Sequence, residues 1–152
     1  MRRSHLLLAA PLAVALAAPA QAVVGFADVV LAYSDSGGGP FAGPYGATLA
    51  SFPVAVSTSV VLGPDPLGDF LSLPTGSFVR VGFTDETVFD GVGNDIFIGE
   101  IGESGEQANI FVSSDNLTFI FLGVATDDGT TSFDLASIGF TGQVTAVKIV
   151  GL

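Results

Sequence analysis

Short apolar runs separated by turn residues are the feature of this sequence that most restricts its fold. Each run is rich in valine, isoleucine, phenylalanine or threonine and is bounded by glycine, proline, aspartate or asparagine, which is typical of β-strands joined by turns. No window of helical length has apolar residues at spacings of three and four, so amphipathic helices are not expected. The runs predict nine strands: Ala27–Tyr33, Val54–Leu62, Phe70–Leu73, Ser77–Phe83, Asp95–Ile101, Ala108–Ser113, Thr118–Ala125, Ser132–Leu135 and Thr145–Val150.

Alternation within these runs predicts which side chains face the core. Val79, Val81 and Phe83 fall on one face of their strand and Arg80 on the other, because successive side chains of a strand point to opposite faces. We therefore expect Arg80 to be solvated. Thr118–Leu122 is apolar on both faces, which predicts a central strand that is covered on both sides.

The first 22 residues have the three regions of a cleavable secretory signal peptide. Arg2 and Arg3 give a positive start, Leu6–Ala18 is apolar, and Ala20–Ala22 has the small residues that a signal peptidase accepts. The apolar stretch is shorter than the roughly 20 residues that span a bilayer. We predict cleavage after Ala22 and export to the periplasm, the cell surface or the medium, with no integral membrane segment in the mature chain.

The mature chain, residues 23–152, has the length of one domain. Its many short strands and frequent turn signals predict an all-β fold, a single antiparallel β-sandwich or jelly roll. The glycine- and proline-rich segment Ser36–Gly46 predicts a long surface loop within this domain. Phe41 and Tyr45 in the loop either stack on a sugar face or hold the loop against the domain.

Charge and missing residue types exclude several function classes. The mature chain keeps two cationic side chains and fifteen carboxylates, a net charge of −13, which repels phosphate backbones and makes nucleic acid an unexpected partner. Cysteine is absent, and the one histidine, His5, lies in the signal peptide. The mature chain therefore lacks the groups for a Ser-His-Asp triad, a Cys-His pair or a zinc site.

Acidic and amide side chains are concentrated between residues 85 and 100. Calcium binds six to eight oxygens from carboxylates, amides and backbone carbonyls, often in loops where glycines permit tight turns. The alternative is an ordinary turn, in which Asp and Asn side chains bond to nearby backbone groups. The predicted calcium ligands are Asp85, Asp90, Asn94, Asp95 and Glu100, with Glu86 beside them and Asp127, Asp128 and Asp134 as the next candidates.

Several blocks of the mature chain, in this order, resemble a known protein family. The blocks are Phe26–Val30, Val61–Asp65, Phe70–Leu73, Val79–Phe83, Asp90–Asp95, Ile98–Glu100, Val112–Asp115 and Phe133–Leu135. They are similar to secreted bacterial β-sandwich proteins, often called cell surface proteins, many of which carry a C-terminal PEP-CTERM sorting signal. The resemblance implies an exported, non-catalytic sandwich of jelly-roll type.

The chain departs from this family in three ways. Phe119 stands where the family usually has tryptophan, the family's final segment does not follow Leu152, and there is no Pro-Glu-Pro sorting motif. Without a final segment, Thr145–Val150 is expected to be an exposed edge strand, which would favour pairing with other chains. The oligomeric state stays open.

The resulting hypothesis is an exported, non-catalytic cell-surface or extracellular-matrix module. Its expected partner is a surface glycan, a polymer or a surface protein, with calcium as a structural ion. The alternatives are a glycan-active enzyme that works through carboxylates and a purely structural subunit. A glycan-binding module needs exposed aromatic side chains on a groove, whereas a glycosidase needs two carboxylates across a cleft, about 5 to 10 Å apart.

Overall fold

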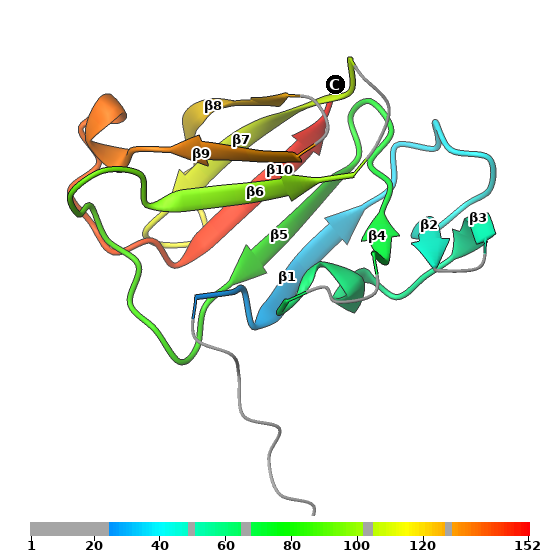
Figure 1. Ribbon diagram of the computed structural model, residues 1–152, viewed down its shortest axis with the longest axis horizontal. Helices are drawn as coiled ribbons and strands as arrows, with labels where there is room; N and C mark the ends of the chain where they lie inside the picture. The colour runs from blue at the N-terminus through cyan, green and yellow to red at the C-terminus, as the bar shows by residue number, and fades with distance from the viewer. Residues whose placement is uncertain (1–24, 49–50, 65–67, 102–104, 127–128) are drawn as a thin grey trace, which may run out of the picture.

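The protein is all-β, as the sequence predicts. The computed structural model describes residues 25–48, 51–64, 68–101, 105–126 and 129–152. Within these ranges the chain forms ten strands and two short 3-10 helices, and its sheets are antiparallel (Figure 1). The predicted signal peptide lies outside the described residues. Among the described residues, no helix is long and apolar enough to cross a membrane.

Five strands form the largest sheet, in the order β1-β5-β10-β7-β8. They are β1 (Val29–Ser34), β5 (Phe78–Gly82), β10 (Ala146–Gly151), β7 (Gln107–Ser113) and β8 (Ile120–Thr126). The alternation along β5 is confirmed, because Val79 and Val81 are buried in the core while Arg80 between them is not part of it. One face of this sheet is therefore apolar and faces the rest of the domain.

Two smaller sheets complete the fold. One has the order β3-β2-β4 and the other is the pair β6-β9. Their strands are β2 (Tyr45–Thr48), β3 (Ser51–Ala55), β4 (Phe70–Leu71), β6 (Ile96–Glu100) and β9 (Gly129–Phe133). In Figure 1, β6 and β9 lie across the five-stranded sheet, with β9 beside β8, and the β3-β2-β4 sheet lies to one side.

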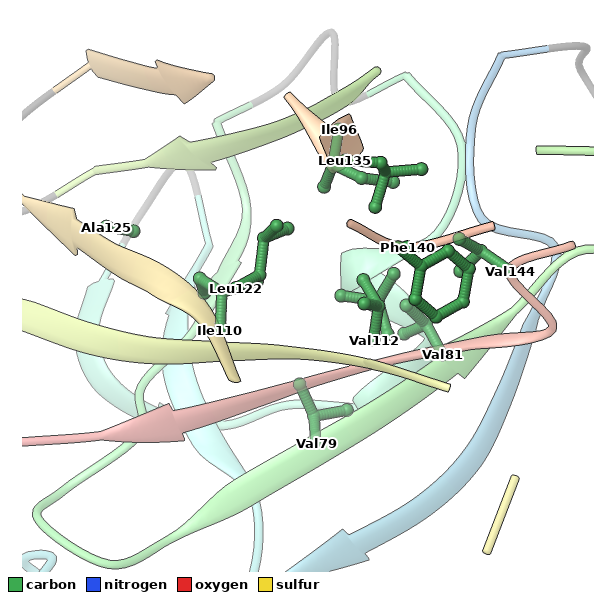
Figure 2. Packing of buried hydrophobic residues seen from close by; sticks show 11 residues of the cluster. Val79, Val81, Ile96, Ile110, Val112, Leu122, Ala125, Leu135, Phe140 and Val144 are labelled. Atoms are coloured by element: carbon green, nitrogen blue, oxygen red, sulfur yellow. The ribbon is translucent and has the colours of Figure 1, made fainter. Parts of the chain in front are cut away.

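The tightest part of the core lies between the five-stranded sheet and the segment that follows β9. Ile110, Val112 and Leu135 are fully buried there, next to Phe140 and Val144 (Figure 2). Leu135 begins the 3-10 helix η2 (Leu135–Ile138), whose first turn is capped by the side chain of the preceding aspartate. The cap fixes the direction of the chain and so places Leu135 in the core.

Two glycines allow backbones to approach more closely than any other residue would. A Cβ atom at Gly46 would lie 1.7 Å from the carbonyl oxygen of Phe70, and one at Gly151 would lie 1.9 Å from that of Leu73. Both contacts are with backbone atoms, which cannot move aside as a flexible side chain can. Glycine at these two positions therefore lets β2 pair with β4 and lets β10 end against the segment after β4.

Two predictions about strand position are wrong. Thr118–Leu122 was predicted to be central, but β8 is an edge strand, and Ile120 and Phe121 are 46% and 48% exposed. The apolar side chains on the second face of this segment have another explanation. Phe121 packs against Phe111 on the outer face of the sheet, and their ring centroids are 5.5 Å apart. Thr145–Val150 was predicted to be an edge strand, but β10 lies at the centre of the sheet, between β5 and β7.

Two predicted boundaries also need correction. Val54–Leu62 was predicted to be one strand, but β3 ends at Ala55 and a 3-10 helix, η1 (Thr58–Val61), follows. Ser57 caps this helix, because its side chain accepts a hydrogen bond from the Ser59 amide. The predicted loop Ser36–Gly46 ends earlier than expected, since β2 begins at Tyr45. The remaining predicted strands match observed ones and differ mainly at their ends.

Candidate functional site

The five predicted calcium ligands lie in separate places. Asp90 and Asp95 come together just before β6, in a group with Asp134. Asp85 belongs to a second acidic group. Glu100 is the last residue of β6, at the opposite end of the strand from Asp95.

The Asn94 amide is directed to a neighbouring strand rather than to either acidic group. Its Nδ2 donates a hydrogen bond of 2.7 Å to Ser132 Oγ in β9. Of the three alternative candidates, Asp127 and Asp128 lie outside the described residues. Asp134 is the one that the fold brings to Asp90 and Asp95.

In the group of Asp90, Asp95 and Asp134, the carboxylates of Asp95 and Asp134 already accept hydrogen bonds from backbone amides. The two carboxylate oxygens of Asp95 accept hydrogen bonds from the Gly91 amide at 2.9 Å and the Leu135 amide at 3.0 Å. Asp134 accepts from the Ala136 amide at 2.8 Å as the cap of η2. The Gly91 and Ala136 contacts match the predicted alternative, a turn in which acidic side chains bind local backbone groups. The Leu135 contact instead joins segments 40 residues apart.

The second acidic group contains Asp28, Asp85 and Glu86, whose carboxylate oxygens lie within 4.8 Å of one another. Asp28 Oδ2 accepts hydrogen bonds from the amide and hydroxyl of Thr84 and from the Asp85 amide. Glu86 Oε1 accepts from the Gly25 amide at 3.2 Å, whereas Glu86 Oε2 is a buried atom with no hydrogen-bond partner. One buried acceptor atom of this group therefore lacks a donor unless a proton is shared with the neighbouring Asp85 carboxyl group.

Opposite pKa shifts distinguish the carboxyl groups of this second group. The amide of Thr84 donates to Asp28 and lowers the pKa of that carboxyl group, because a hydrogen bond to the charged form favours it. Hydrogen bonding to the Asp85 carboxyl group, and then burial, raises the pKa of Glu86. A proton or a cation held between Glu86 and Asp85 relieves the repulsion between the two carboxylates.

A cleft of about 1610 Å³ opens between the five-stranded sheet and the strands in front of it. The strands of all three sheets contribute to its lining, which is mainly apolar. Its floor is formed by Val79, Val81, Val147 and Ile149, and its sides by Ile96, Ile98, Leu71 and Leu73. Ile110, Val112 and Leu135 do not line it. The cleft is therefore separate from the part of the core around these three residues.

The rim of the cleft combines exposed apolar side chains with carboxylates. The exposed apolar side chains that line it are Phe26, Phe52, Phe97, Ile101 and Leu152. The carboxylates that line it are Asp69, Glu86, Asp95, Glu100 and Glu106. The described residues of the lining include no lysine or arginine. The rim therefore presents apolar surface together with negative charge.

The outer face of the five-stranded sheet carries Arg80 and Lys148, the two cationic side chains of residues 23–152, which are paired across β5 and β10. Lys148 Nζ lies 4.4 Å from the ring centroid of Phe78, and the Arg80 guanidinium lies 5.7 Å from that of Phe119. Arg80 also donates to the carbonyl and side-chain oxygens of Asn116. Arg80, predicted to be solvated, is half-buried, and both cations contact aromatic rings on this face of the sheet.

The aromatic side chains of the glycine- and proline-rich loop hold it against the domain. Tyr45 is 6% exposed, and its ring meets that of Phe41 edge-on with centroids 5.5 Å apart. Of the two predicted roles for Phe41 and Tyr45, the geometry agrees with the structural one.

Sequence reasoning missed two features: Asp28 as a member of the acidic group, and the cleft. Asp28 is 57 residues from Asp85, so no local pattern connects them.

No protein-family model, curated protein or solved structure matches this chain. Its function is therefore inferred from the cleft and from the acidic groups described above.

Proposed function

We propose that this protein is an exported, non-catalytic cell-surface or extracellular-matrix module that binds a surface partner in the cleft. The observation that carries the proposal is a large cleft with a mainly apolar lining and with exposed phenylalanines at its mouth. Contiguous exposed apolar surface is typical of an interaction site. The signal-peptide pattern and the resemblance to secreted surface proteins support export.

In this proposal the domain is a single sandwich of jelly-roll type. The five-stranded sheet forms one layer, and the two smaller sheets together form the other. Support comes from the core, which contains residues of the five-stranded sheet, such as Val79 and Ile110, together with Ile96 of β6. The cleft then lies where the second layer is divided between β6-β9 and β3-β2-β4.

The size and chemistry of the cleft favour a polymeric partner over a small molecule. Pockets for small molecules usually measure about 300 to 1,000 Å³, and this cleft measures about 1610 Å³. Its valine, isoleucine and leucine floor offers apolar contact and few hydrogen-bonding groups. Sugar hydroxyls buried on such a floor would lose hydrogen bonds to water. A surface protein is therefore favoured over a glycan among the proposed partners.

A glycan-active enzyme is the second candidate, and one observation favours it. Glu86 lines the cleft and has a raised pKa, whereas neighbouring Asp28 has a lowered one, and such pairs often divide the roles of acid and base. The spacing argues against this function. The carboxylate oxygens lie within 4.8 Å of one another, closer than the roughly 5 to 5.5 Å of retaining glycosidases or 6.5 to 9.5 Å of inverting ones.

Calcium as a structural ion is the other part of the proposal, and Asp28, Asp85 and Glu86 are its favoured ligands. Glu86 Oε2 is buried without a donor, and the adjacent carboxylates repel each other. A divalent cation would supply a partner for that oxygen and neutralise the repulsion. The Asp90 group supports calcium less well, since both oxygens of Asp95 already accept backbone hydrogen bonds.

Co-sedimentation with bacterial cell envelopes tests the proposed function. Ala125 is buried and lines the cleft, so Ala125→Leu places added side-chain volume there. Ala136 is exposed and lies away from the lining, so Ala136→Leu is the matched control. We expect wild type and Ala136→Leu to sediment with envelopes and Ala125→Leu to remain in solution. Protease treatment of the envelopes should abolish binding to a protein partner, whereas periodate should abolish binding to a glycan.

Equal sedimentation of all three proteins, or of none, would contradict a role for the cleft. Release of reducing sugar from envelope polysaccharide by wild type, lost in Glu86→Gln, would instead establish the glycan-active enzyme.

A further inference from the structure

We propose that the outer face of the five-stranded sheet is a second binding surface, which takes a short acidic segment of another protein. The segment places carboxylates on Arg80 and Lys148, and its apolar side chains lie beside them on Phe111 and Phe121. This inference goes beyond the proposed function, because none of these four residues lines the cleft. Three features of the face support it: its composition, the free donors of its two cations, and its exposed aromatic surface.

Strand pairing fixes which side chains lie on this face. One row crosses all five strands from β1 to β8, because each residue is the register partner of the next, and it consists of Ala32, Arg80, Lys148, Phe111 and Phe121. The row beside it consists of Ser34, Phe78, Val150, Asn109 and Val124. The core and the strands β6 and β9 lie on the opposite side of the sheet (Figure 1).

The composition of this face is the reverse of that of the chain. Neither row contains a carboxylate, although residues 23–152 carry fifteen, and one row contains both of their cations. Arg80 and Lys148 are directly opposite each other, and like charges in opposite positions on neighbouring strands repel. Among the described residues, no carboxylate forms an ion pair with either of them. The carboxylates of a partner would relieve this repulsion.

Each of the two cations keeps a donor for such a partner. Lys148 Nζ and Arg80 Nη2 have no hydrogen-bond partner among the described residues, and neither is one of the buried atoms without a partner. Both donors are therefore open to solvent. Arg80 Nη1 donates to Asn116, which holds the guanidinium in place. A carboxylate that reaches the two free donors displaces only water and gains charge-assisted hydrogen bonds.

Apolar surface continues along the row from the two cations. Phe121 is 48% exposed, and its ring meets that of Phe111 edge-on. Phenylalanine and arginine are enriched where proteins contact one another, and exposed apolar surface is typical of an interaction site. A partner that covers these rings also excludes water from the neighbouring ion pairs, which strengthens them.

A short acidic polypeptide segment complements this face better than a long polyanion does. A uronate polymer or a nucleic acid would extend past the two cations and meet the chain's own carboxylates. A polypeptide segment can carry one or two carboxylates and also supply apolar side chains for Phe111 and Phe121. A second copy of this chain is disfavoured as the source of the segment, because residues 23–152 of each copy carry a net charge of −13.

Labelled peptides test this inference by fluorescence anisotropy with the mature protein. The probe has nine residues, in which serine alternates first with two glutamates and then with three leucines, with blocked ends and an uncharged fluorophore. One control peptide has glutamine in place of both glutamates, and another has serine in place of the leucines. We expect the probe to bind at least fivefold more tightly than either control. Equal binding of the glutamine peptide would overturn the charge argument, and no binding of the probe would overturn the inference.

Variants of the protein locate the binding surface. Lys148→Gln should weaken binding of the probe at least fivefold, whereas Lys148→Arg should retain it. Gln143→Glu is the matched control, because Gln143 is exposed outside the two rows and the change lowers the net charge by one, as Lys148→Gln does. Equal binding to wild type and Lys148→Gln would overturn the assigned site.

A second pair of variants tests the aromatic part of the surface. Phe121→Ser should weaken binding of the probe, and Phe89→Ser should not, since Phe89 is 62% exposed but lies outside both rows. Circular dichroism checks that both variants are folded. Equal binding to Phe121→Ser and Phe89→Ser would overturn the contact with the exposed rings.

Two further measurements identify other occupants and separate this inference from the proposed function. Displacement of the probe by an oligouronate at lower concentration than by unlabelled peptide would make a polysaccharide the occupant. Self-association in light scattering that is lost in Lys148→Gln would make it a second copy, and either result overturns the acidic segment of another protein. Ala125→Leu should leave probe binding unchanged, because Ala125 lines the cleft on the other side of the sheet. Loss of probe binding in Ala125→Leu would place the peptide in the cleft and overturn this inference alone.

Discussion

Ala125→Leu should be tolerated or stabilising, although it enlarges a buried side chain. Ala125 is 2% exposed in β8 and lines the cleft. Leucine adds three carbons, and burial contributes about 0.8 kcal/mol per methylene, so filling the cleft is worth up to about 2 kcal/mol. In a close-packed core the same enlargement usually costs about 1 to 3 kcal/mol. The sign of the change therefore reports whether space is present.

Ala146 and Ala136 provide the matched comparison. Ala146 is fully buried and does not line the cleft, so Ala146→Leu should destabilise by about 1 to 3 kcal/mol. Ala136 is exposed, and Ala136→Leu should change stability by less than about 0.5 kcal/mol. The assay is urea unfolding of residues 23–152, with midpoints and slopes compared. Destabilisation by Ala125→Leu as large as that by Ala146→Leu would refute an open cleft beside β8.

Three further predictions concern other parts of the molecule. Gly46→Ala should destabilise strongly, by more than about 2 kcal/mol, because the added Cβ meets the Phe70 carbonyl; near-wild-type stability would contradict that close approach. Asp115 accepts from the Leu117 and Thr118 amides, which lowers its pKa to about 2 from 3.8. Its contribution is therefore present above pH 3.8 and lost as pH falls toward 2, so Asp115→Asn should lower the melting temperature at pH 7 and match wild type near pH 2. A gap that persists at pH 2 would assign the effect to shape rather than charge. In chelator, Glu86→Gln should melt above wild type, because hydrogen bonding to Asp85, burial and repulsion together raise the pKa of Glu86 and disfavour its ionised form. Millimolar calcium should raise the melting temperature of wild type and Asp95→Asn by several degrees but not that of Glu86→Gln; an unresponsive wild type would exclude the ion.

Local sequence patterns predicted the parts of this fold that local physics determines. The burial of Val79 and Val81 on one side of Arg80 follows from strand geometry alone. The order of strands does not, because it depends on contacts between distant segments. The central position of β10 requires pairing with both β5 and β7, which the composition of β10 does not encode.

The candidate site was harder to predict for the same reason. Acidic residues near Asp90 were visible as a cluster in the sequence, but the fold divides them between groups completed by Asp28 and Asp134 from other segments. The cleft depends on β6 and β4 lying in separate sheets. This is a property of how two sheets are arranged and not of one segment. Sequence reasoning therefore found candidate ligand chemistry but not the shape of the surface that would bind a partner.

Titration with the neutral apolar dye Nile red tests the central claim, an open apolar cleft in the native protein, most directly. Wild-type residues 23–152 at pH 7 should bind the dye at one saturable site with a blue-shifted emission. Ala136→Leu should behave identically, and Ala125→Leu should lose the site while remaining folded by circular dichroism. Absence of saturable binding to wild type, or equal binding to wild type and Ala125→Leu, would contradict the account.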